Sequence, residues 1–96
     1  MKSCYLVCYD IREPKRLRNV YRVMKSYGES WQYSVFFCAL KDIDRVRMQS
    51  DLEEEINLRE DQVMILGLTG DEETVRKNLI VLGQALPGPD KSIIVI

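Results

Sequence analysis

The chain has 96 residues, of which 46% are hydrophobic and 30% charged, and its formal net charge is −1. This length fits one domain, 1–96, because two cores of half that size would each be too small to be stable. The chain contains no histidine, which excludes Ser-His-Asp triads, Cys-His nucleophiles and imidazole metal ligands. Any catalysis must therefore use carboxylates, Tyr, Lys, Arg or a metal held by oxygen ligands.

Charge is distributed unevenly along the chain. Residues 1–41 carry eight basic and three acidic side chains, a net +5, whereas residues 42–96 carry six basic and twelve acidic ones, a net −6. A local positive field permits nucleic-acid binding despite the acidic isoelectric point. No stretch approaches the roughly 20 apolar residues that span a bilayer, and no signal-peptide pattern is present. We expect a cytoplasmic protein without a membrane partner.

The first half of the chain predicts a strand, a helix and then one or two strands. Residues 3–9 are typical of a strand that is buried on both faces. Pro14 suits the first turn of a helix and Gly28 suits its end, and apolar residues recur at helical spacing between them. The run 31–40 is rich in aromatic and β-branched residues. It predicts either one bent strand or two short strands.

The second half predicts two helices and two strands. An apolar stripe indicates a helix over about 43–57, and an apolar run indicates a strand over 62–68. A short third helix is expected over about 71–83, a turn over 87–90 and a terminal strand over 91–96. This order is typical of an α+β ferredoxin-like βαββαβ sandwich with an extra C-terminal strand. The topology hosts many functions, so function must come from the site.

The predicted first helix is strongly basic. Residues 12–25 contain six cations and one acid, and at about 100° per residue four of the cations fall within an arc of roughly 80°, opposite the apolar face. This arc is either the solvated face of an amphipathic helix or a stripe that binds phosphates. Solvated faces usually mix both charges, which favours the second interpretation. The cationic stripe consists of Lys15, Arg18, Arg22 and Lys25, and Arg12 and Arg16 complete the candidate nucleic-acid-binding set.

Asp10 lies between the first strand and this helix. An Asp in this position is commonly a turn former or a helix cap, and the functional alternative is a metal ligand or base. A single carboxylate is a poor Mg²⁺ site, but a two-fold dimer would place Asp10 opposite its own copy. Two carboxylates would then share metal ions that polarise a phosphate and activate water. Asp10 is therefore the candidate catalytic and metal-binding residue.

The C-terminal strand is the strongest signal of an interaction. An unpaired apolar edge must join its own sheet or that of another chain, and we favour exchange across a dimer. The aromatic run around Trp31 is able to stack bases, but a strand that is apolar on both faces favours a core or interface role. The predicted dimer interface consists of Tyr9, Ser34, Phe36, Ile93, Ile94 and Val95.

Short motifs occupy residues 3–68 in a fixed order. They are Tyr-Asp-Ile at 9–11, Pro-Lys-Arg-Leu-Arg-Asn-Val at 14–20, Tyr-Gly at 27–28, Gln-Tyr-Ser-Val-Phe at 32–36 and Asp-Gln-Val-Met-Ile at 61–65. Together they resemble the CRISPR-associated protein 2 family, the small proteins of spacer acquisition. Many members of that family carry an acidic residue where this chain has Phe37, which leaves Asp10 alone in the expected site.

The resemblance implies a ferredoxin-like homodimer in which Asp10 binds Mg²⁺ between protomers and Arg16 and Arg18 contact phosphates. It also implies a metal-dependent endonuclease, acting on RNA or double-stranded DNA, that holds duplex DNA in a complex with the CRISPR-associated integrase. Our leading hypothesis is a nucleic-acid-binding homodimer that scaffolds this complex, with nuclease activity as a second function. A non-catalytic ferredoxin-like domain that is regulatory or binds a small ligand stays open as the alternative.

Overall fold

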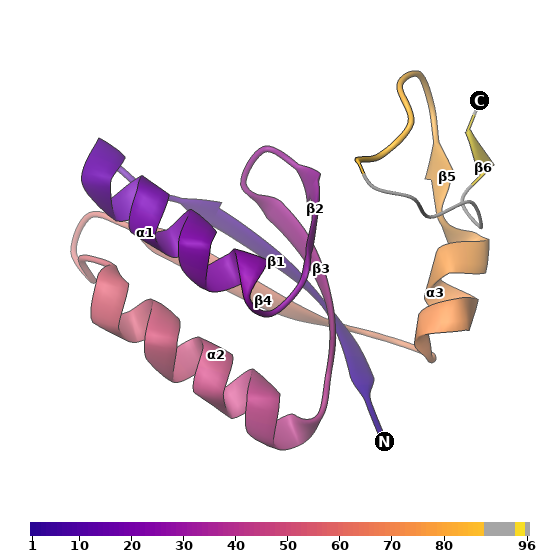
Figure 1. The fold of residues 1–96 in the computed structure, drawn as a ribbon, viewed down its shortest axis with the longest axis horizontal. Helices are drawn as coiled ribbons and strands as arrows, with labels where there is room; N and C mark the ends of the chain where they lie inside the picture. Colours follow the sequence, from indigo (N-terminus) through magenta and orange to yellow (C-terminus); the bar gives the residue numbers. More distant parts are fainter. Residues whose placement is uncertain (88–93, 96) are drawn as a thin grey trace.

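A computed structural model describes residues 1–87 and the backbone of residues 94–95. Its elements in chain order are β1 (Ser3–Asp10), α1 (Pro14–Lys25), β2 (Glu29–Gln32), β3 (Val35–Leu40), α2 (Asp42–Glu55), β4 (Gln62–Leu68), α3 (Glu72–Asn78), β5 (Ile80–Val81) and β6 (Ile94–Val95) (Figure 1). Apart from Pro87, the predicted turn over 87–90 lies outside the described residues. None of the helices in the described part of the chain is long and apolar enough to cross a membrane.

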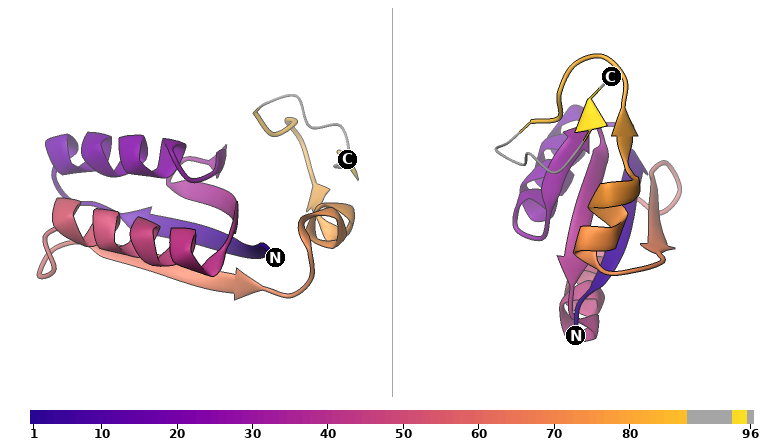
Figure 2. Two further views of the ribbon diagram at one scale, coloured as in Figure 1. Left: turned by 60° about the horizontal axis from the view of Figure 1, so that its bottom comes forward. Right: turned by 90° about the vertical axis from the view of Figure 1, so that its right-hand side faces the viewer.

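Four strands form one sheet in the order β2-β3-β1-β4, and every neighbouring pair is antiparallel. The strand β1 lies inside the sheet, as expected from a segment that is apolar on both faces. The helices α1 and α2 lie side by side over one face of this sheet (Figures 1 and 2). The predicted α+β class and βαββαβ order are confirmed.

The main core lies between the two helices and the sheet. Val7 and Phe36 from the central strands are completely buried against Met24 of α1 and Met48 of α2. Because side chains alternate along a strand, the residues of β1 next to Val7 point to the other face of the sheet. That second face carries a smaller cluster, centred on the stacked rings of Trp31 and Phe37, whose centroids are 4.6 Å apart.

Local chemistry fixes both ends of α1. Pro14 occupies the first turn, where its missing N–H costs nothing, and the Glu13 carboxylate accepts a hydrogen bond from the Arg16 backbone N–H at 2.8 Å. Beyond the helix, Gly28 passes so close to β3 that an added Cβ would collide with the Phe37 carbonyl and the Cys38 sulfur. The Tyr-Gly stop of the sequence motif therefore reflects close packing of the chain on the sheet.

The aromatic run forms two strands, which settles the alternative left open by the sequence. A tight turn separates β2 from β3, and Ser34 in this turn has a φ of 63°, in the left-handed region that is uncommon for residues other than glycine. The Ser34 carbonyl accepts a hydrogen bond from the Tyr9 backbone N–H at 3.1 Å. The turn is thus fastened to the end of β1.

The C-terminal unit, α3 with β5 and β6, differs from the prediction. The helix α3 ends at Asn78, well before the expected residue 83, because the chain becomes extended at Leu79. It is held by Arg76, whose guanidinium lies 5.0 Å above the Phe37 ring and pairs with Glu29 and Glu72. The strand β6 pairs in parallel with β5 of the same chain, in a second, two-stranded sheet. The exchange of this strand across a dimer stays a prediction.

Candidate functional site

Asp10 is the last residue of β1 and its side chain is exposed. Tyr9 points into the core beneath the helices, so Asp10 points to the opposite face of the sheet. On that face β4 presents Met64 and Leu66, which are 55% and 57% exposed. We call Asp10, Met64 and Leu66 the open face, because α3 lies at the other end of the sheet (Figure 2).

The positively charged side chain of Arg12 lies beside Asp10, but the contact between the two is loose. A guanidinium nitrogen of Arg12 lies 3.9 Å from the Asp10 carboxylate, and both side chains are about two-thirds exposed, 68% and 66%. An ion pair of this kind in water holds neither group firmly. The carboxylate is therefore accessible to a cation, and Arg12 is accessible to a phosphate.

The described residues of one chain contain no cluster of three or more His, Cys, Asp or Glu side chains that would hold a metal ion. Mg²⁺ is bound through one or two carboxylates together with water and substrate phosphates. Asp10 fits this requirement as one ligand, and a complete site needs either a second copy of Asp10 or the phosphates of a bound nucleic acid. The Asp10 carboxylate is therefore a suitable ligand for the predicted Mg²⁺, and one chain supplies half of the site.

The loop between β1 and α1 is fixed by Asp61, which immediately precedes β4. The Asp61 side chain is fully buried and accepts hydrogen bonds from the Arg12 backbone N–H at 2.9 Å and from Arg16 Nε at 2.8 Å. It also accepts one from the Asn57 backbone N–H at 2.8 Å. The Arg16 guanidinium, aided by these N–H groups, holds the pKa of the Asp61 carboxyl well below its usual range.

Arg16 is therefore a positioning residue in this structure. The sequence predicts it to contact a phosphate, but its guanidinium is bound by Asp61 and by Glu60, 3.0 Å from its Nη2. The carboxylate partners of Arg16, Glu60 and Asp61, lie 44 and 45 residues away along the chain. Of the two, only Asp61 belongs to a sequence motif, the Asp-x-Val at 61–63.

Asp61→Asn is expected to lower the melting temperature by at least about 4 °C at neutral pH, because an amide cannot satisfy three converging N–H donors. Folding lowers the pKa of Asp61, so its contribution to stability is complete above the unfolded pKa of about 4 and is lost as the pH falls further. The difference in melting temperature between wild type and variant should therefore shrink below pH ~4. A difference that stays constant with pH would show that the carboxylate charge has no role.

The cationic stripe lies on the exposed side of α1, as predicted. Within the described part of the chain none of its four cations has a carboxylate partner: Arg22 reaches only the Asn19 amide oxygen, at 3.4 Å, and Lys25 lies 5.9 Å from the centre of the Tyr21 ring. On α2, by contrast, Arg47 pairs with Asp44 at 3.6 Å. The positive field of the stripe is thus uncompensated and suits a phosphate backbone.

The residues predicted for the dimer interface lie in three different environments. Tyr9 and Phe36 are 8% and 0% exposed in the core beneath the helices, so little of either side chain is available to a second copy. Ser34 forms the turn on the helix-covered side. Ile93 lies outside the described residues, and Ile94 and Val95 form β6. On the face that carries Asp10, the apolar side chains of β4 that face solvent are Met64, opposite Cys8, and Leu66, opposite Leu6. The apolar run at 62–68 was the sequence signal for both.

These features define a small ferredoxin-like α+β protein with one exposed strand-end carboxylate and a basic first helix. The model of the family described as CRISPR-associated protein Cas2 matches residues 3–76. A CRISPR-associated endoribonuclease Cas2 of Rhodospirillum rubrum is 40% identical over 95 residues, covering 99% of this chain and 92% of the relative. Another, from Thermodesulfovibrio yellowstonii, is 46% identical over 68 residues, covering 71% and 75%. The chain belongs to the Cas2 family.

The solved structures agree with this assignment. The crystal structure of Streptococcus pyogenes Cas2 at pH 6.5 matches with a TM-score of 0.67 and 31% identity, over 76% of this chain and 93% of that one.

Proposed function

We propose that two copies of this chain form a dimer that binds nucleic acid during CRISPR spacer acquisition and cuts it with Mg²⁺ held between the two Asp10 carboxylates. The observation that carries the proposal is the exposed Asp10 on the open face, beside Arg12 and one short loop before the helix that carries the cationic stripe. The name endoribonuclease, which the relatives carry, supports RNA as a substrate.

The open face supports a dimer. Met64, which pairs with Cys8, and Leu66, which pairs with Leu6 further along β1, each expose more than half of their surface on the face of the sheet that carries Asp10. Burying such apolar area is the main driving force of protein association. In a two-fold interface the same patch faces itself, so each residue near the axis meets its own copy. A dimer through the open face would bring two Asp10 side chains together and complete the ligand set that one chain lacks.

In such a site the two Asp10 carboxylates hold the metal ion, and Arg12 contacts the phosphate beside it. The bound ion supplies a Lewis acid and an activated water for hydrolysis of the phosphodiester. Asp61 and Arg16 fix the backbone of the loop that joins Asp10 to α1. This contact holds Arg12 in a constant position relative to the Asp10 carboxylate. The chain has no histidine to act as a general base, so the Asp10 carboxylates are the groups of this site that would accept a proton.

Outside the cutting site, the cationic stripe would hold the backbone of a duplex without reading its sequence. Because each copy contributes one α1, a dimer presents two such stripes to one nucleic acid. We propose that this bound duplex is what the protein presents to the CRISPR-associated integrase, for which the dimer acts as a scaffold. Family membership is the support for this partner.

Leu66→Glu is expected to raise the dimer dissociation constant by at least about 100-fold, because a two-fold interface would bury two unpaired carboxylates. Metal-dependent cleavage should fall with it, since separated copies offer one Asp10 each. Sedimentation equilibrium and a cleavage assay at matched protein concentration measure both effects. Ile43→Glu is the matched control, because Ile43 is 55% exposed but lies on α2. A Leu66→Glu variant that remains a fully active dimer would refute the interface.

A further inference from the structure

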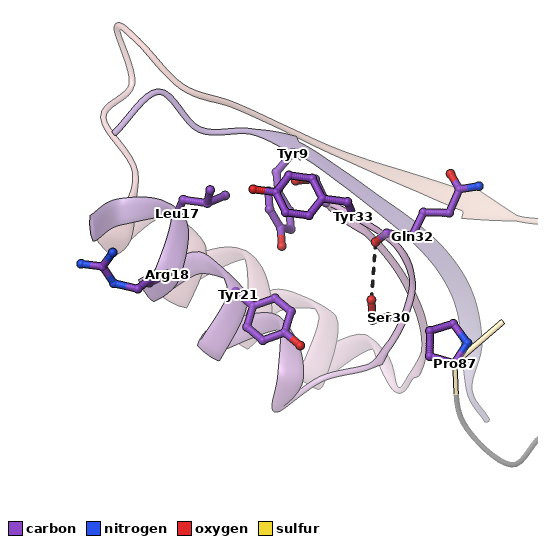
Figure 3. A pocket seen from close by; sticks show the side chains of 9 residues that line it. Tyr9, Leu17, Arg18, Tyr21, Ser30, Gln32, Tyr33 and Pro87 are labelled. Atoms are coloured by element: carbon purple, nitrogen blue, oxygen red, sulfur yellow. Dashed lines mark hydrogen bonds between the residues drawn. The ribbon is translucent and has the colours of Figure 1, made fainter. Parts of the chain in front are cut away.

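A hollow of about 460 Å³ lies on the helix-covered side of the sheet, between α1 and the β2–β3 turn. This volume is within the range of about 300–1,000 Å³ that is typical of small-molecule sites. The residues that line it are Tyr9, Leu17, Arg18, Tyr21, Ser30, Gln32, Tyr33, Ser34 and Pro87 (Figure 3). Three of the nine are tyrosines, and Figure 3 shows their rings and the Leu17 side chain around the same space.

The rings of Tyr9 and Tyr21 pack against Phe36, whereas the ring of Tyr33 is exposed to solvent. The Tyr9 ring stacks on Phe36 in the core, with centroids 6.3 Å apart, and the Tyr21 ring meets Phe36 edge-on at 5.7 Å. Tyr33 is 84% exposed, although tyrosine usually covers its ring with other apolar groups. The left-handed Ser34 and its hydrogen bond to β1 fix the turn that carries Tyr33. The backbone that surrounds the hollow is therefore fixed before any ligand binds, and the exposed ring of Tyr33 is available for stacking.

The charge at the rim indicates what kind of ligand fits. Among the residues that the structure describes, no Asp or Glu lines the hollow, and Arg18 stands at its edge with its guanidinium directed away from the rings (Figure 3). Arg18 belongs to the cationic stripe, and Arg22 follows one helical turn later. Flat aromatic walls beside an unpaired guanidinium suit a ligand that combines a flat ring with a negative charge. A nucleotide has both.

We propose that this hollow binds one unpaired nucleobase of the nucleic acid held by the cationic stripe. The base stacks against Tyr33 over the apolar floor of Tyr9 and Leu17, and Arg18 contacts the adjoining phosphate. A base within a duplex cannot enter the hollow, because both of its faces are covered by its neighbours. The site therefore selects nucleic acids with a single-stranded end or flap. This inference rests on the proposed function and extends it from backbone binding to the form of the substrate.

The test compares a blunt DNA duplex with the same duplex carrying a short single-stranded overhang that contains a fluorescent adenine analogue. Wild type is expected to bind the overhang duplex more tightly and to quench the analogue. Tyr33→Ala should weaken binding of the overhang duplex by about 5- to 100-fold, the range measured for losing one base–aromatic stack, and leave the blunt duplex unaffected. Tyr33→Phe retains the stacking ring and should bind like wild type. An overhang of abasic residues, which keeps the phosphates without bases, should bind like the blunt duplex.

A preference for the overhang that survives Tyr33→Ala, or an abasic overhang that binds as tightly as the normal one, would overturn the base site. Tight binding of the blunt duplex without any preference for an overhang would overturn it too, while leaving the proposed function intact. If wild type binds neither duplex at low salt, the proposed function fails with it. The same series with an RNA overhang shows whether the hollow accepts ribonucleotides, deoxyribonucleotides or both.

Discussion

Asp10→Asn is expected to reduce Mg²⁺-dependent cleavage of nucleic acid by at least about 100-fold. The substitution keeps the size of the side chain but removes the carboxylate charge that would bind the metal, and a metal ion contributes several kcal/mol of transition-state stabilisation. Folding and dimerisation should be unchanged, because the Asp10 side chain is 66% exposed and, among the described residues, makes only a long contact with Arg12. Single-turnover cleavage over a range of Mg²⁺ concentrations measures the effect, with chelator as the zero-metal reference.

The matched control for Asp10→Asn is Glu54→Gln, which removes an exposed carboxylate charge from α2, on the helix-covered side of the sheet and so opposite the face that carries Asp10. It should cleave like wild type. If Asp10→Asn cleaves as fast as wild type, the carboxylate is not the metal ligand and the nuclease part of the proposed function is wrong. Nucleic-acid binding by the cationic stripe would not be affected by that result.

Arg18→Glu combined with Arg22→Glu is expected to weaken duplex DNA binding at low salt by at least about tenfold. Both cations lie exposed on α1 without a carboxylate partner in the described part of the chain, so their reversal replaces attraction to phosphates by repulsion. Each lost phosphate contact should also reduce the slope of log affinity against log salt by about one, hence by about two per chain. Fluorescence anisotropy titrations at several salt concentrations measure both quantities.

Arg45→Glu combined with Arg47→Glu changes the net charge by the same amount on α2 and serves as the control. On α2, Arg45 donates a hydrogen bond to Gln49 at 3.0 Å and Arg47 pairs with Asp44. These contacts within the helix weaken the attraction of the two cations for a phosphate. If both double variants lose affinity equally, overall charge rather than the cationic stripe governs binding. An unchanged salt slope in the α1 variant would remove that helix from the interface.

The elements that depend on local periodicity were predictable from the sequence. The strand at β1, the helix α1 from Pro14 and the strand at 62–68 agree with prediction within a few residues, because each has a clear apolar pattern and a stop signal. The third helix was overestimated: Val75, Leu79 and Leu82 share a helical spacing, but the chain leaves the helix at Leu79. Seven residues of helix are held by the contacts of Arg76, and tertiary contacts of that kind are not visible in a periodic pattern.

The candidate site was predictable where it depends on position along one element. Asp10 at a strand end and the stripe on the side of α1 opposite the apolar face follow from the apolar pattern and helical spacing, and the structure shows both exposed. Pairs between distant segments were not predictable. Arg16 has the same charge and helix as Arg18, and only the fold shows that Asp61 binds one and leaves the other available. The faces of Tyr9 and Phe36 depend in the same way on which side of the sheet the helices cover.

The consecutive residues Tyr9 and Asp10 point to opposite faces of the sheet, and this has a consequence for how a substrate must lie. The proposed base hollow and the proposed metal-binding carboxylate lie on opposite faces of one sheet, so a flat ligand cannot touch both within one protomer. A strand bound in the hollow would have to pass around the end of β1, past the loop 11–13, to reach Asp10. On the proposed function, binding and cleavage would therefore take place at separate positions, and one cut end would be released while the other stays bound.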